Sequence, residues 1–142
     1  MFIKQVSVFL ENKQGRLAEV TGILAKDKIN IKALSMAESR DFGILRLIVN
    51  DWDKCVDVLK KHQFIVRTTD VVGVEIDDNP GGLCLVMDTI EQQGVNIEYM
   101  YAAVKRSADK AVVLFRVDDN DKTVKALKAQ NIAIVSSDFF AD

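Results

Sequence analysis

Residues 72–97 of the chain read VGVEIDDNPGGLCLVMDTIEQQGVNI, and residues 6–31 read VSVFLENKQGRLAEVTGILAKDKINI. At an offset of 66 residues most of the apolar positions of the two stretches coincide, and Gly81 falls on Gly15. The pair Asn96-Ile97 falls on Asn30-Ile31 at the same offset. Internal similarity at a fixed period marks repeated structural units. We therefore predict two copies of one unit, residues 1–70 and 71–142.

The repeat continues outward from these stretches to both ends of each half. After a two-residue insertion in 105–109 the offset becomes 68, where Val49 falls on Val117 and Asp51 on Asp119. The join between the halves, residues 67–70, contains no Gly, Pro or Ser, so no flexible linker is expected.

Composition excludes several classes of protein. Of the 142 residues, 49% are hydrophobic and 28% are charged, which is the balance of a folded chain and not of a disordered one. A net charge of −2 gives no general attraction to nucleic acid or to an anionic membrane. No run approaches the roughly 18 apolar residues of a membrane span, and residues 1–15 lack the pattern of a signal peptide. We expect a cytoplasmic protein.

Periodicity predicts the order strand, helix, strand, strand, helix, strand in each half. In the first half the strands are expected at 2–11, 30–36, 44–49 and 64–66; in the second half at 72–76, 96–101, 111–117 and 132–135. The buried helical stripes are predicted to be Leu17, Val20, Leu24, Ala25; Trp52, Cys55, Val56, Leu59; and Leu83, Val86, Met87, Ile90. This order is that of an α+β protein with two ferredoxin-like βαββαβ plaits in tandem, each an antiparallel sheet with its helices on one face.

Two positions in each half could hold a small ligand. A glycine between the first strand and the first helix lets the backbone approach a ligand, and the helix start offers free N–H groups to a carboxylate or phosphate. An asparagine at the start of the second strand carries both donors and an acceptor, which suit a free amino acid. The alternative is that Gly15 and Gly81 make tight turns and that Asn30 and Asn96 end helices. We expect the glycine turn and the asparagine at the same end of each sheet.

The pattern around these positions resembles the ACT domain, the amino-acid-sensing module of aspartokinase and phosphoglycerate dehydrogenase. Residues 78–83, Asp-Asn-Pro-Gly-Gly-Leu, followed by Asn96-Ile97, match the family pattern well. The first copy matches more loosely, because Gln14 stands where the family usually has proline. The resemblance covers essentially the whole chain as two ACT units.

The resemblance implies a non-catalytic regulatory protein that binds a free amino acid where two ACT units meet. It also implies assembly, expected here as a homodimer, and a regulated partner enzyme or regulator that reads the signal. Because of Gln14 and Arg16, we predict that the two sites differ in affinity or that only one is filled. Carried over residue by residue, the ligand-binding set is Asn12, Gln14, Gly15, Arg16, Leu17, Asn30 and Ile31, with Asn79, Pro80, Gly81, Gly82, Leu83, Asn96 and Ile97.

Residues near the predicted site indicate which class of amino acid to expect as the ligand. Aromatic amino acids or histidine are placed above small aliphatic ones, because methionines and tyrosines could line a pocket for a ring and nearby acids favour positive character. The residues considered are Met36, Tyr99, Met100 and Tyr101, and the acids Asp77, Asp78 and Glu98.

Other classes of function have weaker signals. His62 is expected at a solvated helix end, and Cys55 and Cys84 as buried thiols, so no catalytic or metal-ligand spacing, and no cofactor, is indicated. Arg16 after Gly15 weakly resembles the phosphate-binding loop of acylphosphatases, so a small plait enzyme of that type is a less favoured alternative. The third strand lacks the stacking aromatics of RNA-binding plaits, and neither first loop has the Cys-x-x-Cys of copper carriers. A purely structural or protein-interaction module without a small-molecule ligand remains the main alternative.

Overall fold

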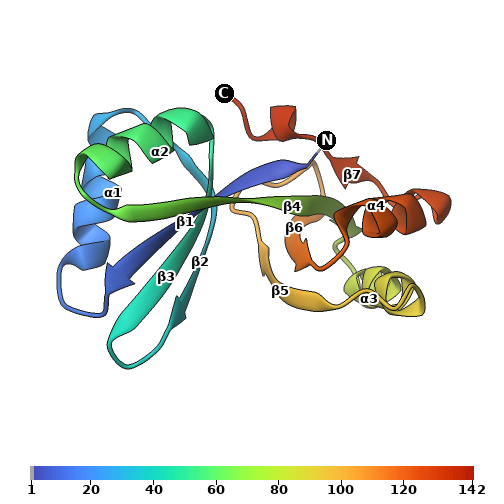
Figure 1. The fold of residues 1–142 in the computed structure, drawn as a ribbon. Coiled ribbons are helices and arrows are strands. Elements are labelled where there is room, and N and C mark those ends of the chain that lie inside the picture. Colours follow the sequence, from blue (N-terminus) through green and yellow to red (C-terminus); the bar gives the residue numbers. More distant parts are fainter. Residues whose placement is uncertain (1) are drawn as a thin grey trace. The chain divides into compact units, whose positions relative to one another are not determined.

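The computed structural model describes residues 2–142, which form two compact units. The N-terminal unit comprises Lys4–Thr69 and Phe140–Asp142. The C-terminal unit comprises Asp70–Phe139 and the short stretch that ends at Ile3. In each unit two helices cover one face of an antiparallel sheet (Figure 1). The predicted fold class, two ferredoxin-like plaits in tandem, is confirmed.

The N-terminal unit is built from β1 (Ile3–Glu11), α1 (Arg16–Lys26), β2 (Ile31–Glu38), β3 (Phe42–Val49), α2 (Trp52–Lys61) and the start of β4 (Ile65–Asp77). Its strand order is β2-β3-β1-β4. Strand β3 is antiparallel to both neighbours, and Leu47 lies opposite Val6 on one side and Leu34 on the other. Strands β1 and β2 therefore run parallel to each other.

The C-terminal unit repeats this arrangement with residues 70–77 of β4, α3 (Gly82–Gln92), β5 (Ile97–Ala102), β6 (Lys110–Val117), α4 (Asn120–Ala129) and β7 (Ile134–Val135). Its strand order is β7-β4-β6-β5. A short 3-10 helix, Ser137–Phe139, follows β7 and was not foreseen from the sequence. Strand β4 runs without a break through residues 67–70, where no glycine or proline interrupts it.

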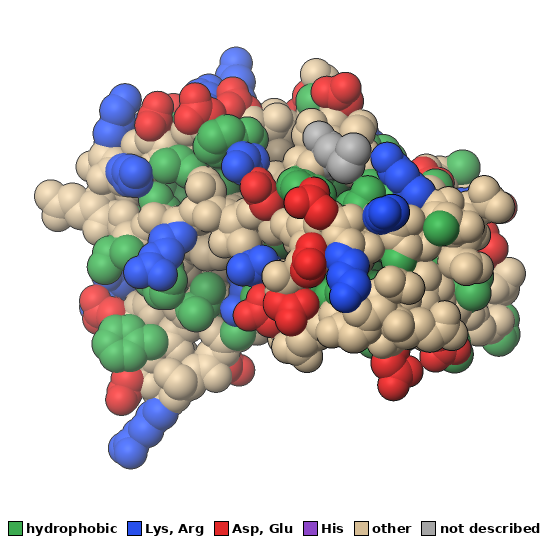
Figure 2. Space-filling view, turned by 45° about the vertical axis from the view of Figure 1, so that its right-hand side comes forward, with side chains coloured by type: hydrophobic (Ala, Val, Ile, Leu, Met, Phe, Trp, Pro, Cys, Tyr) green, Lys and Arg blue, Asp and Glu red, His purple; other side chains and the backbone are tan. Residues whose placement is uncertain are grey.

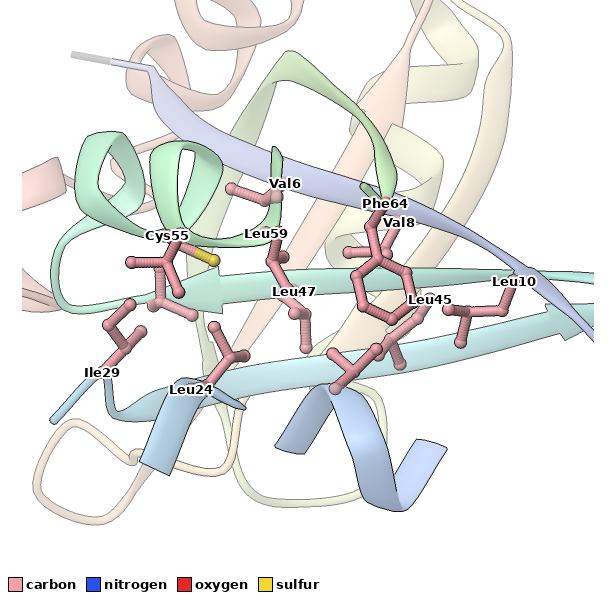
Figure 3. Close-up of a cluster of buried hydrophobic side chains, with 13 residues drawn as sticks. Val6, Val8, Leu10, Leu24, Ile29, Leu45, Leu47, Cys55, Leu59 and Phe64 are labelled. Carbon is pink, nitrogen blue, oxygen red and sulfur yellow. The ribbon is translucent and has the colours of Figure 1, made fainter. Parts of the chain in front are cut away.

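Each unit has one hydrophobic core between its sheet and its helices. In the N-terminal unit Val6, Val8 and Leu10 share one face of β1 and point toward side chains of α1 and α2 such as Leu24 and Leu59 (Figure 3). Val72, Val74 and Ile76 on β4 hold the corresponding positions in the second core. Burying each such aliphatic side chain contributes about 1.5–3 kcal/mol.

The helical stripes differ from prediction at their first turns and at Ala25, which is exposed in the last turn of α1. Trp52, the first residue of α2, is 39% exposed, and Leu17 and Leu83 in the first turns of α1 and α3 are also exposed. Val58 and Thr89 are buried instead. Helical spacing places a residue on a face, but its burial depends on whether a strand extends beneath it.

Candidate functional site

The turn between β1 and α1 is fastened to the β2–β3 hairpin by Asn12. Its backbone N–H donates to the carbonyl of Asp41 at 2.8 Å, and its side-chain amide donates to the carbonyls of Ser39 and Arg40 at 3.2 and 3.1 Å. Gly15 caps the helix with a φ of 88°, in the left-handed region. Nothing lies within 4 Å of the place where a Cβ on Gly15 would stand, so the glycine serves the backbone conformation and leaves open space beside it.

The matching turn of the C-terminal unit, between β4 and α3, has the same left-handed glycine. Gly81 has a φ of 93° and is likewise open on its Cβ side. Gly82 differs, because a Cβ there would overlap the carbonyl oxygen of Asp77. Beside this turn lies a polar cleft of about 420 Å³, spanned by ion pairs from Arg106 to Asp78 and from Lys110 to Asp77.

The four long helices begin in two different ways. Helices α2 and α4 are capped by aspartates: Asp51 accepts from the Lys54 N–H at 3.1 Å, and Asp119 accepts from the Lys122 N–H at 3.0 Å. Helices α1 and α3 have no side-chain cap. In the described part of the chain, the first-turn N–H groups of these two helices, at residues 17–18 and 83–84, have no acceptor. Unpaired donors at the positive end of a helix dipole favour an anion.

The first helical residue distinguishes the two turns. The Arg16 guanidinium donates to Glu11 at 3.2 Å and to Glu19 at 2.9 Å, and its centre lies 5.5 Å from the Phe64 ring. Its Nε is buried without a partner among the described residues. Lys13, and then Arg16, hold the pKa of Glu11 below its usual value. In the C-terminal unit Gly82 stands in the place of this cation.

The asparagines Asn30 and Asn96 begin their strands by equivalent contacts. The Asn30 N–H donates to Asn50 Oδ1 at 2.8 Å, and the Asn96 N–H donates to Asp118 Oδ1 at 3.1 Å. Within residues 2–142 neither asparagine side chain makes a hydrogen bond of its own. Their neighbours Ile31 and Ile97 pack against the two cores.

The prediction that the glycine turn and the asparagine share one end of the sheet is wrong. The turn lies level with the β2–β3 hairpin, where Glu11 is opposite Phe42, whereas Ile31 is opposite Val49 at the other end of β3. The reason is the direction of α1, which returns the chain to the start of β1 before the parallel strand β2 begins. An eight-residue strand separates the two features by roughly 25 Å. The C-terminal unit repeats this separation, since Asp77 is opposite Lys110 and Ile97 is opposite Val117.

A cavity of about 300 Å³ adjoins Asn96 and Ile97. It is also lined by Met87, Asp88 and Glu91 of α3, residues that were not nominated from the sequence as ligand neighbours. Glu91 is three positions after Asp88 and four after Met87, so these residues share one face of a helix that ends shortly before Asn96. This spacing was the sequence signal that could have identified Asp88 and Glu91. The corresponding positions of the N-terminal unit are the small residues Gly22 and Ala25.

The residues considered as neighbours of the ligand's side chain do not come together in one pocket. Tyr99 and Tyr101 stack on each other with ring centroids 6.5 Å apart, while Met36 and Met100 pack against the cores. Glu98 pairs with Arg116 at 3.4 Å. None of these five lines the cavity beside Asn96.

The thiols and the histidine lie in different surroundings. Burial, and then Asp51, raises the pKa of Cys55 to about 12, so its thiol is inert at neutral pH. Cys84 is exposed, which corrects the expectation of a buried thiol, and the Asp88 charge raises its pKa. His62 ends α2 as expected, with its Nδ1 2.9 Å from the Val58 carbonyl oxygen.

On the face shown in Figure 2 acidic, basic and hydrophobic side chains are interspersed, and neither sign of charge covers the whole face. None of the helices within residues 2–142 combines the length and the hydropathy needed to cross a membrane.

Comparisons with known proteins bear on the whole chain. The family model described as ACT domain pair matches residues 1–142. The crystal structure of protein BT0572 from Bacteroides thetaiotaomicron is 45% identical, has a TM-score of 0.90, and is matched over 96% of this chain and 94% of that one. The regulatory subunit of aspartate kinase from Thermus thermophilus, in its ligand-free form, is 17% identical with a TM-score of 0.63 and 92% coverage of both chains, which shows a shared fold.

Comparison with curated protein sequences gives no significant match. The family match over the full length, the tandem plaits and the paired glycine turns agree with one another. The chain belongs to the ACT domain pair family.

Proposed function

We propose that this chain is a cytoplasmic, non-catalytic regulatory protein that binds a free amino acid between two ACT units. Residues 1–70 and 71–142 are proposed as its two ACT domains, and a homodimer as its assembly. The glycine turn of one unit and the Asn-Ile start of the second strand of another contribute the contacts. The proposed residues are those carried over from the family pattern, in the turns 12–17 and 79–83 and at 30–31 and 96–97.

The contrast between capped and uncapped helices carries the proposal. Asp51 and Asp119 each accept one first-turn N–H of α2 and α4, whereas α1 and α3 begin at Gly15 and Gly81 with no side-chain cap. In each unit the second helix has an aspartate cap and the first helix has none. A ligand carboxylate would supply the missing acceptors.

The separation within each unit requires that two units share the ligand. A free amino acid is much shorter than the roughly 25 Å between the turn and the start of β2. The carboxylate would meet the helix start of one unit, and its ammonium would donate to the amide oxygen of Asn30 or Asn96 of another. Asp88 and Glu91, beside Asn96, favour a side chain of positive character such as histidine at that position.

The proposed mechanism follows from this sharing. A ligand that contacts two units binds their paired state better than their separated state, and so stabilises that pairing by mass action. The geometry fixed in this way is the signal that a partner enzyme or regulator would read. The turn that contains Arg16, whose guanidinium is already paired with Glu11 and Glu19, is expected to bind more weakly than the turn that contains Gly82.

A thermal-shift screen of the twenty amino acids tests the proposal. We expect one class of amino acid to raise the melting temperature of the full chain. Gly81→Val should abolish that rise, because the new side chain enters the open space beside the turn and a β-branched residue is strained at the φ of 93°. Asn96→Ala should weaken the rise. The matched control is Asp119→Ala, which lowers stability by about 1 kcal/mol through loss of a cap but should keep the rise.

The screen also separates the proposal from its main alternative. If no amino acid raised the melting temperature at saturating concentration, the chain would be a structural or protein-interaction module. If Asp119→Ala lost the rise as fully as Gly81→Val, general damage and not a lost contact would explain both results.

A further inference from the structure

The segment Phe140–Asp142, here called the clasp, is part of the N-terminal unit although it follows the C-terminal unit in the chain. Phe140 is 2% exposed and so anchors the clasp. The Asp142 carboxylate is held at both oxygens: Lys32 Nζ donates to Oδ1 at 2.5 Å, and Asn50 Nδ2 donates to Oδ2 at 2.8 Å. Because each oxygen has its own donor, the carboxylate is held in one orientation and its charge is compensated.

Both donors are constrained in the structure that holds the Asp142 carboxylate. The Lys32 side chain is only 12% exposed, although lysine is usually well exposed. Asn50 is oriented at its other end, because its Oδ1 accepts the N–H of Asn30. These contacts place the carboxylate beside the Asn30-Ile31 start of β2.

The C-terminal unit has an acidic residue at both corresponding positions. Glu98 corresponds to Lys32, and Asp118 corresponds to Asn50, at the offsets of the repeat. Asp118 uses its carboxylate to accept the Asn96 N–H, and Glu98 pairs with Arg116. Two acids cannot bind a carboxylate, so this arrangement is particular to the N-terminal unit.

We propose that Lys32 and Asn50 form a carboxylate-binding site that Asp142 occupies in cis, so that the clasp competes with a free carboxylate ligand. The inference rests on the proposed function in one respect: the proposed function supplies the ligand that the clasp would exclude from the Asn30 end of β2. A tethered group competes at a high effective concentration, on the order of millimolar for a short tether. If the site is free in about a tenth of the molecules, its apparent affinity for an external carboxylate falls roughly tenfold.

Titration of the full chain with L-aspartate, followed by the NMR signals of the Asn50 side-chain amide, tests this proposal. Ionic strength is kept constant with sodium chloride, because charged contacts are screened by salt. We expect Asp142→Ala to bind L-aspartate at least about tenfold more tightly than the unsubstituted chain. Asp138→Ala removes an exposed acid from the adjacent 3-10 helix and should change nothing. Asp142→Asn, which keeps the shape of the side chain, serves if the alanine variant folds poorly.

Reversal at the donor completes the test. Lys32→Glu, which copies Glu98, should abolish L-aspartate binding in the Asp142→Ala background. Equal affinities with and without Asp142, or no saturable shift in either Asp142 variant, would overturn the proposal. Such a failure would leave an amino acid found by the thermal-shift screen unaffected, whereas failure of that screen alone would leave the clasp competition intact.

Discussion

The consecutive glycines Gly81 and Gly82 should respond differently to substitution, because only one of them is limited by space. Gly81 has a left-handed backbone and nothing near its missing Cβ. Alanine in that conformation costs about 1–2 kcal/mol, and the smaller entropy of the unfolded chain offsets roughly 0.4–1 kcal/mol of it. Gly81→Ala should therefore lower the free energy of unfolding by about 1 kcal/mol.

Gly82 begins α3 at an ordinary φ, so helix propensity alone favours alanine by up to about 1 kcal/mol. The structure predicts the opposite sign. A Cβ at Gly82 would overlap the backbone carbonyl oxygen of Asp77, and relieving such overlap typically costs about 1–3 kcal/mol. We expect Gly82→Ala to be destabilising.

Asparagine substitutions separate the two causes. Asparagine tolerates the left-handed region, so Gly81→Asn should be milder than Gly81→Ala. Gly82→Asn should be no milder than Gly82→Ala, because the overlap occurs at the Cβ that both residues carry. Equilibrium unfolding in guanidinium chloride, followed by circular dichroism on the full chain, gives the four values. A stabilising Gly82→Ala would refute the reasoning and show that the turn can open to admit a side chain, as it does at Arg16.

Three further predictions concern caps, thiols and pH. Asp51→Ala and Asp119→Ala should each lower the free energy of unfolding by about 1 kcal/mol in the same denaturation assay, and a change near zero would contradict the capping geometry. Cys84 should react with a thiol reagent in the native protein while Cys55 stays protected until unfolding, as mass spectrometry after timed alkylation would reveal; early labelling of Cys55 would argue against its burial. Because the folded pKa of Glu11 is lowered, its ion pairs stabilise the fold above its unfolded-state pKa and lose that effect as pH falls through the folded value. The difference in melting temperature between the unsubstituted chain and Glu11→Gln should therefore shrink on acidification, and a constant difference would speak against the pairing.

Local pattern was sufficient for most of the fold. The alternation in 6–10 and the helical spacing of Val20 and Leu24 predicted elements that the structure confirms. Element ends were less accurate: the last strand shrinks to Ile134–Val135. These successes share one cause, since backbone periodicity is set by residues a few positions apart.

The candidate site was less predictable because it joins distant parts of the chain. The sequence nominated Gly15 and Asn30 correctly as features of a turn and a strand start, but placed them at one end of the sheet. Their separation depends on the direction in which α1 returns the chain. The exposure of Cys84 likewise depends on what packs against α3, which no local spacing records.

By itself the sequence determined the tandem repeat, the order of strands and helices, and the resemblance to the ACT domain, because each is written in residue types at short or fixed spacings. Only the tertiary structure decided that the glycine turn and the asparagine lie at opposite ends of a unit. It alone also showed that α1 and α3 start without a side-chain cap. It showed as well that Asp142 meets Lys32, although the two residues are 110 positions apart in the chain. Such contacts arise from packing between segments far apart in sequence, where loop closure and chain direction, and not periodicity, set which side chains meet.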